Sequence, residues 1–136
     1  MKGRKEMNAN ELINSYFKYL ENNTAIINHE DGWSEIILPF MDNHRDFLDL
    51  FMRQDEETKD IIITDNGDTF SNLELRGIDV SDYDFESIVS SANAEIQNKE
   101  ITMVTSKGNF PWRFIEMVQA ILAVQAVGNS TLAKIN

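Results

Sequence analysis

Short apolar runs separated by turn signals constrain the fold of this chain more than any other feature. WSEIILPF (33–40), DFLDLFMRQ (46–54) and EITMVT (100–105) each carry apolar residues at a period of two, as strands do. DIIIT (60–64) is a β-branched run typical of an inner strand. Turn residues such as those of HEDG and DEETK lie between the runs. The spacing therefore predicts a largely antiparallel sheet that contains two hairpins, at 25–40 and 94–105.

Two longer segments carry the period of a helix. NANELINSYFKYLENN (8–23) places five apolar residues at helical spacing behind Asn8, a suitable N-cap. NFPWRFIEMVQAILAVQAV (109–127) has a proline in its first turn, and Gly128 is the expected end of that helix. We expect the second helix to be the most buried one.

Two shorter helices are predicted between the strands. Ser71 and Glu74 have the spacing of a capping box, and Gly77 has the position of a helix stop. A further capped helix is expected to begin at Ser81. The predicted order is one helix, four strands, two helices, two strands and one helix, which indicates an α+β fold packed by N-terminal and C-terminal helices.

Length and composition indicate one domain in the cytoplasm. The 136 residues suit a single α+β domain at 8–128, with a flexible basic tail at 1–7 and a C-terminal tail at 129–136. Cysteine is absent, and no charged-then-apolar leader begins the chain. The longest apolar run, 117–127, is shorter than the roughly 20 residues of a membrane-spanning helix. We therefore expect no membrane contact.

The net charge of the chain is strongly negative. The chain has 23 acidic and 12 basic side chains, a formal charge of -11. Residues 30–86 contain 17 acidic and 4 basic side chains, so this segment alone carries 17 minus 4, or -13. Such a charge opposes direct binding of DNA or RNA.

Several motifs resemble those of a bacterial and phage family known as domain of unknown function 1828. The matching stretches are ILPFMDNHRD, ITDNGD, LRGID, FP and QAILAV, which extend over most of the chain. Asn66 departs from the family turn, where a second aspartate is expected. The resemblance implies a mobile-element context and a stand-alone copy that lacks the C-terminal second domain of longer relatives. It implies no known activity.

One cluster of residues has ligand chemistry for a metal. If the strand that begins at Asp46 pairs antiparallel with the strand that ends at Thr64, Asp42, His44 and Asp46 approach Asp65 and Asp68. Carboxylates of this kind hold Mg²⁺ or Mn²⁺ and activate water. The metal-dependent alternative is thus a hydrolase of the phosphodiesterase or nuclease type, with Asp42, Asp46 and Asp65 as metal ligands. Turn formation and helix capping explain the same residues without a metal, so the primary prediction contains no catalytic residue, metal or cofactor.

The acidic residues suggest a second kind of site, a surface for a basic partner. The interaction residues predicted from the sequence are Asp49, Asp55, Glu56, Glu57, Asp60, Asp68, Glu74, Asp82, Asp84 and Trp33. Simple solvation of a charged surface is the alternative explanation.

The function predicted from these features is protein binding rather than catalysis. We expect an acidic, phage-associated interaction domain that inhibits a host defence or DNA-binding enzyme by imitating nucleic acid. The alternatives are the metal-dependent hydrolase and the regulatory half of a two-component bacterial system. An exposed aromatic edge around Trp33 is compatible with a dimer.

Overall fold

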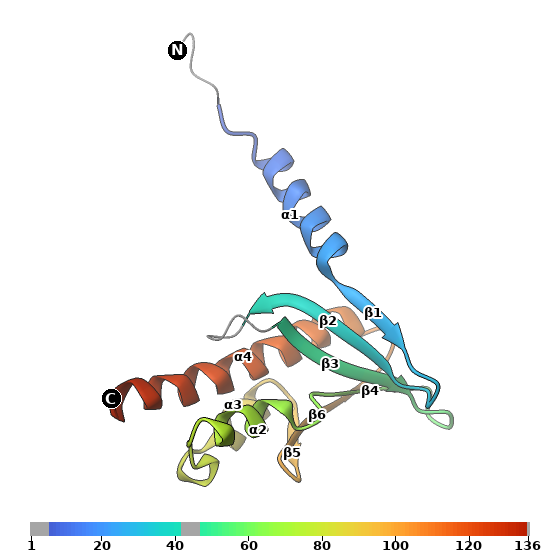
Figure 1. Ribbon diagram of the computed structural model, residues 1–136. Helices are drawn as coiled ribbons and strands as arrows, with labels where there is room; N and C mark the ends of the chain where they lie inside the picture. Colours follow the sequence, from blue (N-terminus) through green and yellow to red (C-terminus); the bar gives the residue numbers. More distant parts are fainter. Residues whose placement is uncertain (1–5, 42–46, 136) are drawn as a thin grey trace.

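The computed structural model describes residues 6–41 and 47–135 and has the α+β architecture that the sequence predicts (Figure 1). The elements follow the predicted order, with one additional 3₁₀ turn. They are α1 (Ala9–Asn23), β1 (Ala25–Asn28), β2 (Ser34–Met41), β3 (Phe47–Gln54), β4 (Ile61–Thr64), α2 (Asp68–Leu75), η1 (Val80–Asp82), α3 (Phe85–Ser91), β5 (Glu95–Gln97), β6 (Glu100–Thr105) and α4 (Phe110–Ile135).

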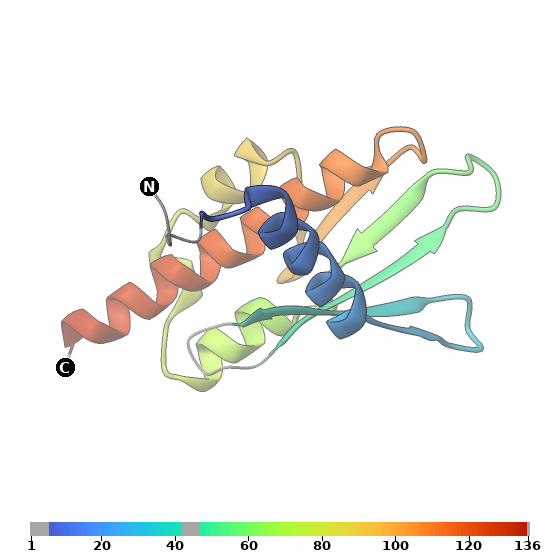
Figure 2. The same ribbon diagram turned by 90° about the horizontal axis from the view of Figure 1, so that it is seen from above.

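The strands form one antiparallel sheet in the order β1-β2-β3-β4-β6-β5. β4 is an inner strand, as its β-branched composition predicts, and pairs with both β3 and β6. Pro39 lies inside β2, next to a register shift and beyond the part of β2 that pairs with β1. Its missing N–H therefore leaves no gap in that pairing. The β1–β2 and β3–β4 turns lie at the same end of the sheet (Figure 2).

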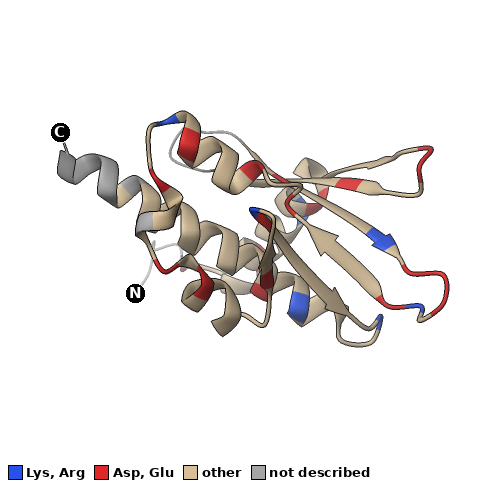
Figure 3. Cartoon of the chain, turned by 90° about the horizontal axis from the view of Figure 1, so that it is seen from below, with Lys and Arg blue, Asp and Glu red and all other residues tan. Residues whose placement is uncertain are grey.

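The helices α2, α3 and α4 build the core against one face of the sheet. Alternate residues of each strand point to this face, so Leu48 and Leu50 are buried whereas Phe47 is exposed. Met117 and Ile121 of α4 are fully buried among them. The opposite face carries no buried apolar residue among the described strands, and Figure 3 shows β3 and β4 uncovered by a helix.

α1 projects away from the sheet and from the other helices (Figure 1). Its N-cap is Asn8, whose side chain accepts a hydrogen bond from the N–H of Glu11, as predicted. The helix contains no buried residue, although its apolar residues have the spacing of a core-facing helix. Among the residues that the structure describes, little therefore covers the apolar face of α1.

Two predicted helix starts were wrong. α2 begins at Asp68 rather than at Ser71, because Asn66 and Gly67 adopt positive φ angles of 57° and 78° and turn the chain into the helix earlier. α3 begins at Phe85 rather than at Ser81, since the Asp84 side chain caps the N–H of Ser87. The stop at Gly77 is confirmed, because the N–H groups of Gly77 and Ile78 close the helix onto Glu74 and Leu73.

Gly128 does not end α4, which continues to Ile135. A Cβ atom at Gly128 would lie only 2.4 Å from Cδ2 of Leu73. The glycine therefore permits close packing between α2 and α4, and the helix tolerates it because one interior glycine costs only about 1 kcal/mol. Among the described helices, none is long and apolar enough to cross a membrane.

Candidate functional site

The DNGD connector between β4 and α2 is a tightly bonded turn. Asn66 and Gly67 supply two successive left-handed residues, for which asparagine and glycine are well suited. Asparagine at this position thus fits the backbone that the turn requires.

Asp65 holds this turn together from inside the protein. Its side chain is only 1% exposed. One carboxylate oxygen, Oδ1, accepts hydrogen bonds from the N–H groups of Gly67 and Ile101, both at 2.9 Å. The other, Oδ2, accepts from the N–H of Thr69 at 3.2 Å. Asp65 therefore caps α2 and ties it to the start of β6, and both of its oxygens are engaged in structural bonds.

The predicted metal-dependent site is only partly described by the structure. Asp42, His44 and Asp46 lie outside the described residues. β3 pairs antiparallel with β4, as expected, but Thr64 faces Phe51. Phe51 lies four residues beyond Phe47, a distance of about 13 Å along a strand. The approach of Asp42, His44 and Asp46 to Asp65 stays a prediction. Among the described residues, no three His, Asp or Glu side chains are placed so that they could hold a metal ion together.

The uncovered face of the sheet carries a row of cross-strand partners. Glu35 of β2 is paired with Phe51 of β3, Phe51 with Thr64 of β4, and Thr64 with Thr102 of β6. Cross-strand partners share one face, so Asp49, two residues before Phe51, also lies on it. Glu100 belongs to the same surface and accepts a hydrogen bond from the hydroxyl of Thr64.

Glu35, Asp49 and Asp68 form a carboxylate cluster at this face. α2 lies beside the first half of β3, where β4 has already ended, and brings Asp68 to the wall of a small cavity of about 60 Å³ that Asp49 also lines. The Oδ1 atom of Asp49 is buried and has no hydrogen-bond partner among the described residues. No Lys or Arg of the described chain forms an ion pair with these three carboxylates.

Burial, together with the mutual repulsion of the carboxylates, changes the protonation of the cluster. Burial, and then the hydrogen bond and negative charge of Glu35, raise the pKa of Asp49 to about 7. Burial, followed by the charges of Asp65 and Glu35, also raises the pKa of Asp68. The pKa of Glu35 is lowered by its hydrogen bonds to Asp49 and then to His29. Below about pH 7, Asp49 is therefore protonated in larger part than an ordinary aspartate, whereas the pKa of Glu35 is shifted in the opposite direction.

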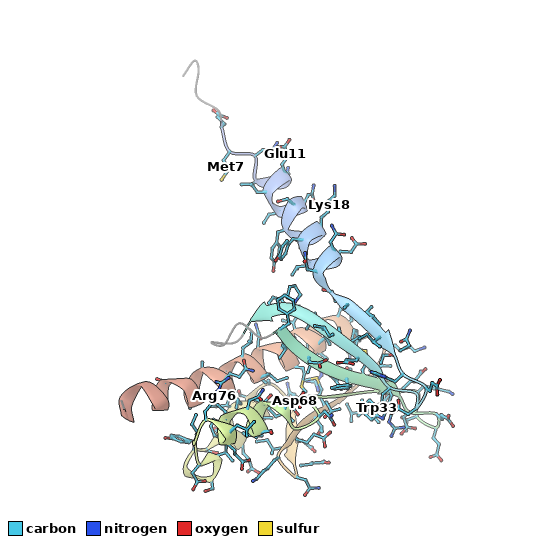
Figure 4. The ribbon with its side chains drawn as sticks, viewed as in Figure 1. Met7, Glu11, Lys18, Trp33, Asp68 and Arg76 are labelled. Atoms are coloured by element: carbon cyan, nitrogen blue, oxygen red, sulfur yellow. The ribbon has the colours of Figure 1, made fainter. Side chains whose placement is uncertain are left out.

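A pocket of about 370 Å³ lies next to the cluster and is lined by aromatic and acidic side chains, among them Trp33, Phe51 and Glu100. His29, on its wall, contacts Glu35 with 3.0 Å between Nε2 and Oε1. The guanidinium of Arg53 stacks 5.1 Å from the centre of the Trp33 ring. Trp33 and Asp68 lie on the side of the sheet away from α1 (Figure 4). This combination of carboxylates and an aromatic ring is suited to cationic side chains.

A comparison with known families decides the identity of the domain. The family described as Domain of unknown function DUF1828 matches residues 38–124. The chain belongs to this family. No curated protein and no solved structure matches the chain. The DUF1828 match contains Asp49 and Asp68, whereas α1, β1 and Glu35 precede it.

The other predicted interaction residues of this DUF1828 domain do not join the cluster. The loop between β3 and β4 holds Asp55, Glu56, Glu57 and Asp60, at the same end of the sheet as Glu30 and Asp31 (Figure 3). Glu74 forms an ion pair with Lys99 at 3.1 Å, and Asp84 caps α3. Asp82 lies in η1, and its side chain is not among those described. Of the predicted set, Asp49 and Asp68 converge, with Trp33 nearby.

Sequence reasoning missed Glu35 and Glu100 in this DUF1828 domain. Glu35 alternates with Ile36 in β2, and that period places it on the face away from the core. Only the register Glu35–Phe51–Thr64 shows that it meets residues of other strands. A cross-strand register is not encoded by local spacing alone.

Proposed function

We propose that this DUF1828 chain is an acidic protein-interaction domain whose uncovered sheet face binds a basic surface of a partner protein. The observation that carries this proposal is the cluster of Glu35, Asp49 and Asp68, three carboxylates whose ion pair among the described residues is that of Glu35 with His29. A Lys or Arg side chain of a partner adds positive charge to this cluster, where burial and then the neighbouring Glu35 raise the pKa of Asp49.

The aromatic residues next to the cluster support a cationic guest. Trp33 already stacks with Arg53 of its own chain, so its ring face accepts a guanidinium. Phe51 provides an apolar floor between Glu35 and Thr64 for the aliphatic part of such a side chain. Arginine is therefore the expected anchor of the partner.

The class of partner that we propose is an enzyme or regulator that itself binds nucleic acid. Such proteins carry basic grooves that attract rows of phosphates. The acidic loops at 30–31 and 55–60 flank the aromatic pocket and extend the negative surface along one end of the sheet. Occupation of a basic groove by this surface inhibits the partner by excluding its nucleic acid.

Capture of a basic partner with competition by DNA tests this function. The whole chain is immobilised and incubated with purified DNA-binding enzymes, and binding is measured with and without double-stranded DNA. We expect capture that DNA competes away. The variant Glu35→Gln/Asp68→Asn is expected to bind at least tenfold more weakly, or about 1.4 kcal/mol.

The matched control is Glu74→Gln, because Glu74 already pairs with Lys99 away from the cluster. It is expected to bind like the unmodified chain. Capture that is insensitive to DNA, or equal loss in both variants, contradicts the proposed site.

A further inference from the structure

α1 carries an apolar face that is too wide for a free helix. With successive residues about 100° apart, the exposed apolar side chains of α1 cover an arc of about 160°. They are Leu12, Ile13, Tyr16, Phe17 and Tyr19, each between 49% and 58% exposed. Glu11 and Lys18 lie together on the other side of the helix (Figure 4). An arc of this width is typical of a helix that packs against a protein core.

β1 follows α1 closely in the chain and also exposes apolar side chains. A single residue, Thr24, joins α1 to β1. Ile26 is the cross-strand partner of the buried Ile36, yet it is 65% exposed because β1 is the outermost strand. Ile27, on the opposite face, is 43% exposed. The exposed apolar residues of both elements are together called the α1–β1 surface, with Ile26 and Ile27 on opposite faces of β1.

The two edges of the sheet are protected to different degrees. β5, at one edge, is three residues long and begins with Glu95, which disfavours pairing with another strand. β1, at the other edge, contains no charged residue, proline or bulge. An exposed apolar edge strand of this kind pairs readily with a strand of another chain unless it is covered.

Charge favours a second copy of this chain as the cover. Residues 7–28 contain one Lys and two Glu, so they contribute only -1 to the total of -11. Two copies that meet at this segment keep their acidic regions apart, and contact through any part of residues 30–86 brings strongly negative segments together.

The exposed area is sufficient for a specific dimer. Seven side chains are about half exposed, and half of the roughly 150–200 Å² that large apolar side chains offer is about 80–100 Å² each. Two copies then bury about 1,100–1,400 Å² in side chains alone, which falls within or near the size of specific interfaces, about 1,200–2,000 Å².

We propose that the α1–β1 surface is a two-fold interface on which a second copy of the chain docks. The α1 helices of the two copies cover each other's apolar faces, and the unprotected β1 edges lie against each other. This interface borders the proposed binding face at Ile27, the cross-strand partner of Glu35, whereas Trp33 and Asp68 lie on the side away from α1.

The mass of the whole chain in solution tests this interface. Sedimentation equilibrium is measured between about 1 and about 100 µM, which brackets micromolar affinity. The expected mass is twice the 15.6 kDa of one chain. Phe17→Glu is expected to give the mass of one chain, with an unchanged circular dichroism spectrum, because Phe17 is not buried within the monomer.

The matched control is Lys18→Glu, on the charged side of the same helix, which is expected to remain a dimer. A second interface variant, Ile26→Lys, places a protective charge on the β1 edge and is expected to weaken the dimer at least tenfold. A wild-type mass of one chain at every concentration overturns the proposal, and so does a Phe17→Glu variant that stays dimeric.

Discussion

At the scale of single residues, Asp65 and Asp49 are two aspartates with opposite environments. Asp65 is buried and saturated by three backbone N–H donors. Asp49 has a buried oxygen without a described partner and sits near other carboxylates. The first side chain stabilises the fold, and the second retains unused capacity to accept a proton or a cation.

Substitution of Asp65 tests its structural role. We expect Asp65→Ala to lower the free energy of unfolding by about 3–5 kcal/mol, since buried N–H donors lose their acceptor. Asp65→Asn retains an oxygen for Gly67 and Ile101 but presents an amide to Thr69, and a loss of about half that size is expected. Urea unfolding measures both. A value within error of the wild type for Asp65→Ala contradicts the role assigned to this carboxylate.

The raised pKa of Asp49 predicts a pH-dependent stability. The folded chain holds this proton more tightly than the unfolded chain, because the pKa rises from 3.8 to about 7. The stability due to Asp49 is therefore fully present below about pH 4 and is lost as pH rises through about 7. Asp49→Asn removes this dependence, so its melting temperature is expected to exceed that of the wild type increasingly between about pH 5 and about pH 8.

Asp55 provides the opposite control for that titration. Hydrogen bonds from the N–H groups of Thr58 and Glu57 lower the pKa of Asp55. Its stabilising effect is present above its ordinary pKa and is lost as pH falls through the lowered value. Asp55→Asn is thus expected to be less stable than the wild type at neutral pH and to approach it in acid. If the stability of Asp49→Asn and of Asp55→Asn relative to the wild type changes with pH in the same direction, the environments assigned to Asp49 and Asp55 are contradicted.

At the scale of elements, the contact between α2 and α4 depends on Gly128. Helix propensity alone predicts that Gly128→Ala stabilises α4 by about 1 kcal/mol. The close approach of Leu73, which is almost fully buried, predicts instead a net loss of about 1–3 kcal/mol. Gly108→Ala is the control, since no atom lies within 4 Å of a Cβ there. Thermal unfolding of Gly128→Ala together with Leu73→Ala is expected to show a smaller loss than the sum of the two single losses.

Local sequence signals predicted the elements well and their ends less well. Period-two runs and turn residues are local, so the strands, the Asn98–Lys99 hairpin turn and the order of elements follow from them. Because Asn66 and Gly67 have positive φ angles, α2 begins earlier than the capping box at Ser71 predicts. Gly128 lies inside α4 rather than at its end, where it permits close packing against Leu73. The carboxylate cluster depends on the register of β3 against its neighbours, which is a property of the assembled sheet.

At the scale of the whole molecule, the net charge of -11 predicts opposite effects of salt on folding and on binding. Salt screens the repulsion among acidic residues, so the melting temperature of the free chain is expected to rise between about 0.05 and about 0.5 M NaCl. Affinity for a basic partner is expected to fall over the same range. Both measurements are repeated with sodium sulfate at equal ionic strength as a second salt. An affinity that does not change with salt contradicts an electrostatic interface.

The carboxyl titration of Asp49, measured by nuclear magnetic resonance with and without a short arginine-rich peptide, tests the proposed binding face most directly. A guanidinium placed at the cluster favours the ionised carboxylate. We predict that saturating peptide lowers the pKa of Asp49 from about 7 toward its ordinary value of 3.8, and that binding near pH 7 releases protons. Saturable binding of the peptide with an unchanged pKa of Asp49 would contradict a cation site at Glu35, Asp49 and Asp68.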